Sequence, residues 1–274
     1  MLLGVKHIKI PITRMKLHLE FILARYLPLY AFVAFLASML NAYIVIPSII
    51  EQIIASSMYS TPFGPYGPYP GRIGVSLTLT HLIFSLVSIS LAASMAGELR
   101  STSLFHLSQP IRRIEYSISW LLSIAWLPSI LMALSLFVPL ATFDPRFVLR
   151  VSFQPVYLRL VEDLLTFSVF CWAALTRRRG IVAFIGLFFV IILPYLSMAL
   201  LSLIFYVFYQ NTNPSTLLLT IYEVVFPSTA SILFMGGFAQ GVPDPVKASL
   251  GTLLMLAFLQ ATYLTYFTRR FEVK

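Results

Sequence analysis

Residues 116–141 read YSISWLLSIAWLPSILMALSLFVPLA and contain no Asp, Glu, Lys or Arg. An α-helix rises about 1.5 Å per residue, so about 20 apolar residues are needed to cross the hydrocarbon core of a bilayer. The stretch Tyr116–Ala141 is therefore long enough and apolar enough to form a transmembrane helix.

Five other stretches share this character. They are Leu27–Ile46, Val75–Ala96, Leu160–Leu175, Ile181–Phe208 and Leu250–Phe267. The composition agrees, since 59% of the 274 residues are hydrophobic, 11% are charged and the mean hydropathy is +0.88. Soluble domains carry about 25% charged residues. The sequence thus predicts an all-α polytopic membrane protein, with six transmembrane helices in a single transmembrane domain over residues 1–274.

The basic residues are distributed unevenly over the loops between these spans. The two ends and one set of alternate loops hold 14 of the 19: Lys6, Lys9, Arg14, Lys16, Arg25, Arg100, Arg112, Arg113, Arg177, Arg178, Arg179, Arg269, Arg270 and Lys274. The opposite side holds Arg72, Arg146, Arg150, Arg159 and Lys247. Because cytoplasmic loops are rich in Lys and Arg, the pattern predicts a multi-pass protein of the cell (plasma) membrane with both termini cytoplasmic. Membrane lipid accounts for the net charge of +9, and nucleic acid is not an expected partner.

Two segments outside the spans have a distinctive composition. Residues 1–26 are basic, and their apolar residues follow helical spacing, which predicts a cytoplasmic amphipathic segment along the membrane interface, although part of it also alternates like a strand. Residues 209–248 are interrupted by proline and glycine, which predicts an external region with short or re-entrant helices before the last span. Within the fifth span, Pro194 predicts a kink.

The fourth span carries charged residues in its outer turns. Arg159, Glu162 and Asp163 are costly in lipid, so they are expected to face protein, water or one another. Arg159 and Asp163 are four residues apart and could pair on one helix face. These residues could line a substrate or proton pathway, or form an ion pair where the helix leaves the membrane; the second interpretation is favoured.

Motifs for chemistry within the chain are missing. The dipeptide Gly-Lys of a phosphate-binding loop never occurs, so the chain is not expected to hydrolyse ATP by itself. The four histidines are scattered, the single cysteine Cys171 lies within the fourth span, and no nucleophile elbow is present. The sequence predicts no enzyme activity, no cofactor and no metal site.

The connection between the second and third spans is charged at both ends. Residues 96–115 read AGELRSTSLFHLSQPIRRIE, with a short apolar centre and a proline that separates two helical pieces. We define residues 97–115 as the cytoplasmic elbow. Such a segment would suit docking onto a soluble partner, although a plain interfacial connector is the alternative.

At this elbow the chain resembles the permease subunits of export-type, type-2 ATP-binding cassette (ABC) transporters. Their corresponding loop reads Glu, then Gly-Thr-Leu, a leucine-rich stretch and Pro-x-Ser-Arg. Glu98, Thr102, Pro110 and Arg113 stand at the matching positions, whereas Ser101 and Ser103 depart from the pattern. The ending YFTRRFEVK, residues 266–274, also resembles the aromatic, twin-basic exit of that family.

The resemblance implies a permease that forms the substrate pathway together with a second permease subunit, identical or different. Separate ABC ATP-binding subunits, which hold ATP and Mg²⁺, would dock at the elbow. The residues implied in this coupling are Glu98, Thr102, Pro110, Arg112 and Arg113.

Two other functions remain open from the sequence. One is a passive channel or a membrane scaffold subunit of a larger translocation or secretion complex. The other is a secondary transporter, for which Glu162 and Asp163 are the only candidates for ion coupling.

Overall fold

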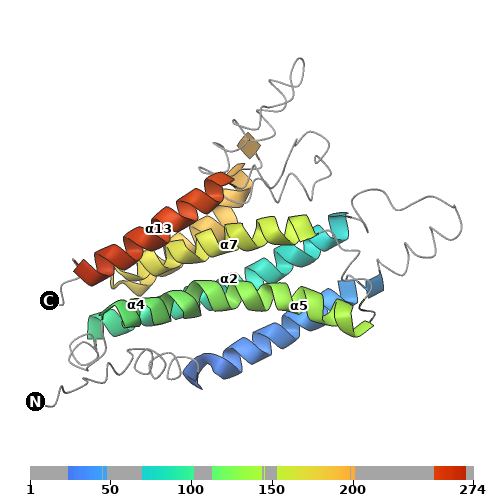
Figure 1. The fold of residues 1–274 in the computed structure, drawn as a ribbon, viewed down its shortest axis with the longest axis horizontal. Coiled ribbons are helices and arrows are strands. Elements are labelled where there is room, and N and C mark those ends of the chain that lie inside the picture. The colour runs from blue at the N-terminus through green and yellow to red at the C-terminus, as the bar shows by residue number, and fades with distance from the viewer. Residues whose placement is uncertain are drawn as a thin grey trace, which may run out of the picture.

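The computed structural model describes residues 24–44, 46–47, 70–101, 113–143, 145, 153–197, 199–200 and 250–269. Within these ranges the chain is all-α, and Figure 1 shows its helices side by side as a bundle. The six helices are Ala24–Ile44, α2 (Pro70–Ser101), Arg113–Phe143, α7 (Phe153–Ala174), Arg179–Ser197 and α13 (Leu250–Arg269). The third consists of α4 (Arg113–Leu121), the π-helical turn η1 (Leu122–Trp126) and α5 (Leu127–Phe143), and the fifth begins with α8 (Arg179–Leu187) and the π-helical turn η2 (Phe188–Ile192).

Five of these helices are long and apolar enough to cross a membrane. The candidate spans are Ala24–Ile44, Thr78–Arg100, Arg113–Phe143, Arg179–Ser197 and Leu250–Arg269. The protein is therefore a multi-pass membrane protein, as predicted. The fourth predicted span is also a helix, α7, but its three charged residues set it apart from the other five.

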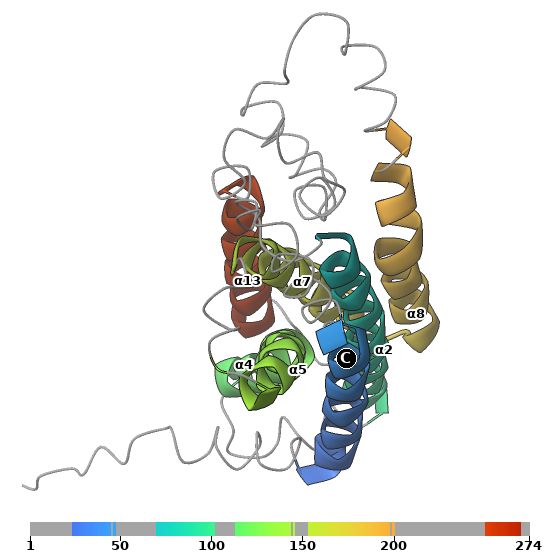
Figure 2. The ribbon, with the colours of Figure 1, turned by 90° about the vertical axis from the view of Figure 1, so that its right-hand side faces the viewer.

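The helix with the three charged residues, α7, lies in the middle of the bundle. It packs against α2, α8, α13 and η1, and Figure 2 shows it between α13 and α2. Large hydrophobic side chains remain exposed on each of the other five helices, for example Phe35, Phe184 and Leu254 at 57%, 68% and 72%. None of the large hydrophobic side chains described on α7, from Tyr157 onward, is exposed. The lipid-facing surface is thus supplied by the other helices, and α7 keeps its charges inside.

Both π-helical turns precede a proline by two residues. A proline has no N–H, so the carbonyl four residues before it loses its helical donor. At η1 this carbonyl belongs to Ile124, because Pro128 follows it. The N–H of Leu127 bonds to Leu122 rather than to Ser123, which frees a second carbonyl. The same arrangement occurs at η2, before Pro194, where the sequence predicted a kink.

Neighbouring helices supply donors to the two freed carbonyls of η1. The hydroxyl of Tyr30, in the first helix, donates to the Ser123 carbonyl at 2.5 Å. The hydroxyl of Ser88, in α2, donates to the Ile124 carbonyl at 2.8 Å. The proline-interrupted turn thereby becomes the place where three helices are joined by hydrogen bonds in an apolar interior.

A second polar contact joins the same three helices nearer their other end. The Asn41 amide donates to the Ser135 hydroxyl at 3.2 Å, and the Ser76 hydroxyl donates to the Asn41 side-chain oxygen. All three side chains are buried. Small hydroxyl residues allow helices to approach closely and form hydrogen bonds with one another. Such contacts matter in a membrane, because the hydrophobic effect does not favour helix–helix contacts over helix–lipid contacts.

Close packing of the fifth helix on α2 depends on Gly186. A Cβ placed there would lie 2.5 Å from Cγ1 of Ile89, a branched side chain of α2. We expect Gly186→Leu to lower the free energy of unfolding by about 1–3 kcal/mol, since α8 must move away from α2. Equilibrium unfolding in mixed detergent micelles would measure this loss. The exposed neighbour Leu187→Ala is the control, and an equal loss in that variant would contradict the role of the close contact.

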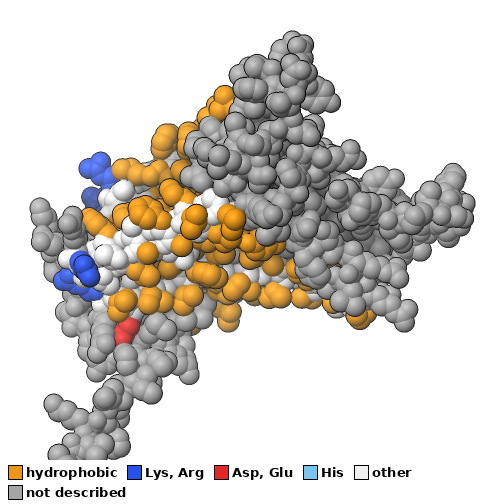
Figure 3. All heavy atoms as spheres, turned by 45° about the horizontal axis from the view of Figure 1, so that its top comes forward, with side chains coloured by type: hydrophobic (Ala, Val, Ile, Leu, Met, Phe, Trp, Pro, Cys, Tyr) orange, Lys and Arg blue, Asp and Glu red, His pale blue; other side chains and the backbone are white. Residues whose placement is uncertain are grey.

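Charge gathers at one end of the bundle. The last residue of α2, the first of α4 and the ends of α7 and α13 lie at the left of Figure 1. Figure 3 shows Lys and Arg side chains at this end, acidic side-chain atoms near them, and many hydrophobic side chains along the rest of the described surface of that face. The described arginines here are Arg25, Arg100, Arg113, Arg177, Arg178, Arg179 and Arg269.

Candidate functional site

An ion pair holds Glu98 at the end of α2. Arg25, near the start of the first helix, places Nη1 3.3 Å from Oε1 of Glu98. The Arg25 side chain is 57% exposed and that of Glu98 is 18% exposed. Ion pairs this close to water contribute about 0–1 kcal/mol to stability. The consequence of the pair is therefore mainly positional, since it fixes a carboxylate where the elbow begins.

A second arginine covers the residue before Glu98. The guanidinium of Arg179 lies against Gly97, where a Cβ would be 2.3 Å from Nη2. Arg179 opens α8 directly after a tight turn, in which Arg177 adopts a left-handed conformation with φ 59° and donates its N–H to the Ala174 carbonyl. A larger residue at position 97 would have to displace the guanidinium, which occupies the space of a side chain. Arginines from two different helices thus surround the end of α2.

The coupling residues expected from the sequence are described only in part. Arg113 is the first residue of α4 and is exposed at the same end of the bundle as Glu98. Thr102, Pro110 and Arg112 lie outside the described residues, as do most of the segment 1–26 and the region 209–248.

The charged residues of α7 form a buried cluster. Arg159, Glu162 and Asp163 are 3%, 1% and 0% exposed. Arg159 Nε lies 3.2 Å from Asp163 Oδ1, and Arg159 Nη1 lies 3.8 Å from Glu162 Oε2. Spacings of three and four residues put all three side chains on one face of the helix, which the sequence indicated for Arg159 and Asp163. That face is turned into the protein.

A histidine from α2 completes this cluster, and sequence reasoning missed it. His81 Nδ1 lies 2.5 Å from Asp163 Oδ1, and His81 is 3% exposed. In the sequence the four histidines are scattered, and none has a neighbouring ligand or partner motif. The signal that could have found His81 is its position inside an apolar span, where an ionisable residue usually has a partner.

Two further contacts hold the imidazole ring of His81. The ring of Phe167, on α7, stacks on it with centroids 6.2 Å apart and planes 4° apart. The Ser85 hydroxyl, one turn further along α2, lies 3.5 Å from both ring nitrogens. Because Phe167 and Asp163 are four residues apart on α7, one helix face supplies both the stacking ring and the carboxylate.

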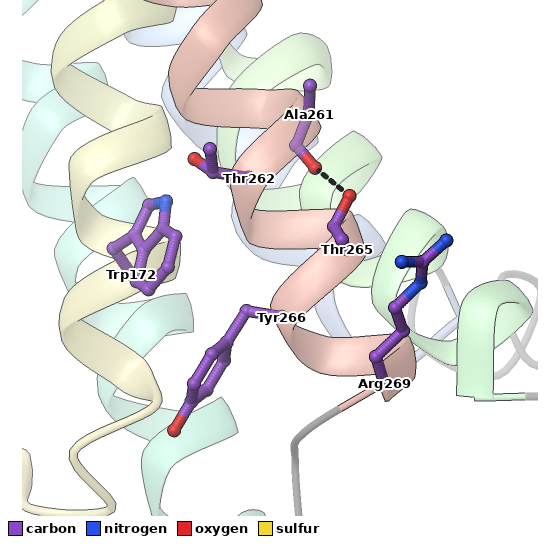
Figure 4. Close-up of a pocket in the computed structure, with 6 residues that line it drawn as sticks. All are labelled: Trp172, Ala261, Thr262, Thr265, Tyr266 and Arg269. Atoms are coloured by element: carbon purple, nitrogen blue, oxygen red, sulfur yellow. Dashed lines mark hydrogen bonds between the residues drawn. The ribbon is translucent and has the colours of Figure 1, made fainter.

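A groove opens between α7 and α13, shown in Figure 4. Its volume is about 480 Å³, and its lining residues are Trp172, Ala261, Thr262, Thr265, Tyr266 and Arg269. Two of its polar groups are paired: Trp172 of α7 donates to the Leu259 carbonyl of α13 at 3.0 Å, and Thr265 donates to the Ala261 carbonyl of its own helix at 2.7 Å. The groove contains none of the expected coupling or pathway residues, although Tyr266 and Arg269 belong to the aromatic, twin-basic ending noted in the sequence.

A metal centre is not formed by the described part of the chain, in which no three His, Cys, Asp or Glu side chains group as ligands. Comparison with known proteins finds no matching family model and no matching curated protein.

Proposed function

We propose that this chain is the permease subunit of an ATP-driven transporter of the export type, in which a second permease subunit completes the pathway. Separate ABC ATP-binding subunits would supply ATP hydrolysis. In this proposal the charged end of the bundle faces the cytoplasm of a cell whose plasma membrane holds the protein, and the elbow is the docking site.

One observation carries the proposal: Glu98 and Arg113, which match the family pattern, lie near the two ends of the elbow and at the same end of the bundle. The Arg25 contact keeps Glu98 at the surface, and Arg113 is exposed. The chain also lacks a phosphate-binding loop, so an ATP-driven function needs a partner. Charged residues at both ends of a connection between two spans support docking of a soluble subunit.

Reversing the charge of Glu98 should weaken that docking. We expect Glu98→Arg to reduce the amount of ATP-binding subunit that co-purifies in mild detergent by about tenfold, which corresponds to about 1.4 kcal/mol of binding free energy. The partner is identified by peptides that contain a phosphate-binding loop, and ATPase activity of the purified complex gives a second readout.

The double variant Arg25→Glu/Glu98→Arg is the matched control. It restores an ion pair between the first helix and α2, so it separates the intrachain role of Glu98 from docking. We expect the double variant to keep the docking defect. Full recovery would show that Glu98 acts only within the chain, and transport that needs a proton gradient but no ATP would overturn the permease proposal itself.

A further inference from the structure

We propose that His81 is a proton-binding residue, and that proton uptake by its ring transfers Arg159 from Asp163 to Glu162. This inference does not rest on the proposed permease role. Its starting point is the buried contact between α2 and α7, in which His81 meets the charged face of α7.

Two cationic or donor groups crowd one carboxylate oxygen without making an aligned hydrogen bond. His81 Nδ1 and Arg159 Nε lie 2.5 Å and 3.2 Å from the same atom, Asp163 Oδ1. Among the residues described, both Asp163 oxygens and Arg159 Nε are buried and have no hydrogen-bond partner. A carboxylate can serve two donors on separate oxygens, and a buried acceptor without a donor is unfavourable. The site therefore has a second arrangement available to it.

The short contact defines where the first proton sits. Two lone pairs repel at 2.5 Å, so the contact with Asp163 Oδ1 favours the ring tautomer that carries its hydrogen on Nδ1, although the two groups are not aligned as a hydrogen bond. The free nitrogen of the neutral ring is then Nε2. It lies 3.5 Å from the Ser85 hydroxyl, whose oxygen can accept the N–H that a second proton creates.

The second proton turns the ring into an imidazolium and changes the balance of charge around Arg159. The imidazolium attracts the Asp163 carboxylate and repels the Arg159 guanidinium, which already lies 3.8 Å from Glu162. In a low-dielectric interior these forces act at full strength over a few ångströms. Arg159 is thus expected to leave Asp163 for Glu162 when His81 binds its second proton.

Among the described side chains, the charged groups that act on His81 are Arg159 and Asp163 of α7, while those of α2, α4 and α13 lie at the helix ends. The segments η1 and α5 contain no charged residue, the single charge of the fifth helix is Arg179 at Gly97, and the single charge of the first helix is Arg25 at Glu98. Tyr43 and Tyr195, on the helices flanking α2, point outward with 82% and 75% exposure. Among described side chains, the charged partners of the ring are therefore Asp163 and Arg159, and Glu162 lies beside Arg159.

The test follows Nε2 of His81 in the full chain held in lipid nanodiscs. His7, His18 and His106 are replaced by Gln, so that ¹⁵N-histidine spectra report His81 alone over the range of about pH 5–8. We expect Asp163→Asn to move half-protonation to lower pH and Arg159→Gln to move it to higher pH, each by about one unit, a tenfold change in proton affinity. ¹⁵N-guanidinium signals of Arg159 should change together with His81, and Glu162→Gln should abolish that linked change.

Matched variants keep the result interpretable. Ser168→Ala changes another buried polar residue of α7 and should leave the titration unaltered. Asp163→Glu retains the carboxylate, so His81 should titrate in it as in the parent chain. If Arg159→Gln fails to fold, the contrast between Asp163→Glu and Asp163→Asn still tests the proposal. The proposal is overturned if His81 gains no second proton over this range, or if removal of the carboxylate and removal of the guanidinium shift its titration in the same direction.

Discussion

Arg159→Gln is expected to lower the free energy of unfolding by about 3–5 kcal/mol, because it leaves the Asp163 carboxylate buried without its cation. Arg159 and Asp163 are 3% and 0% exposed, so water cannot replace the lost partner. An exposed pair such as Arg25 and Glu98 should lose about 1 kcal/mol or less on the same kind of change. Equilibrium unfolding in mixed micelles compares Arg159→Gln with Arg25→Gln directly.

The double variant Arg159→Gln/Asp163→Asn separates pairing from packing. It removes both charges, so it should recover part of the stability that Arg159→Gln loses. If the double variant is as unstable as the sum of the two single variants, the two residues do not act as a pair. If Arg159→Gln unfolds no more easily than Arg25→Gln, the cluster is not the buried, water-free site that its exposure indicates.

Much of the helix layout could be predicted from the sequence, because length and the lack of charge are local properties. The stretch Tyr116–Ala141 was predicted within a few residues of the helix Arg113–Phe143. The fourth stretch was also predicted as a helix, but hydropathy could not show that α7 lies in the centre while the other helices carry the exposed apolar surface. Central position depends on how every helix turns its polar face, and that is a property of the assembled bundle.

The contacts of the candidate cluster within α7 could be predicted from the sequence, but the contact with His81 could not, because it too depends on the assembled bundle. Arg159 and Asp163 belong to one helix, so their spacing of four residues was enough to bring them together. His81 lies in another helix, 82 residues before Asp163, and only the rotation of α2 against α7 makes them neighbours. The contact of Arg179 with Gly97 likewise depends on the turn between α7 and α8 and on the place of both helices beside α2.

Two prolines carry the same local signal for a disturbed helix, but the sequence prediction used it only at Pro194. Pro194 was predicted to disturb its helix, and a π-helical turn precedes it. Pro128 occupies an equivalent place in the third helix and has the same effect. What the sequence could not provide is the identity of the donors, since Tyr30 and Ser88 come from two other helices.

Removing those donors should destabilise the bundle more than an ordinary interhelical hydrogen bond would predict. Hydrogen bonds between membrane helices average about 0.6 kcal/mol, partly because the polar groups find other partners. The Ile124 carbonyl loses its usual helical donor, since Pro128 has no N–H, and the Leu127 N–H bonds to Leu122 instead of Ser123. We therefore expect Tyr30→Phe and Ser88→Ala to cost about 1–3 kcal/mol each.

The double variant Tyr30→Phe/Ser88→Ala should lose about 2–6 kcal/mol, because the two donors act on different carbonyls from different helices. Ser94→Ala is the matched control, since the Ser94 hydroxyl bonds only to the Ser90 carbonyl of its own helix and should cost little. Pro128→Ala restores an N–H for the Ile124 carbonyl and should reduce the cost of Ser88→Ala while leaving that of Tyr30→Phe largely unchanged. Equal losses with and without Pro128 would contradict the explanation, because the hydroxyl of Ser88 would then be needed for something other than the carbonyl that the proline frees.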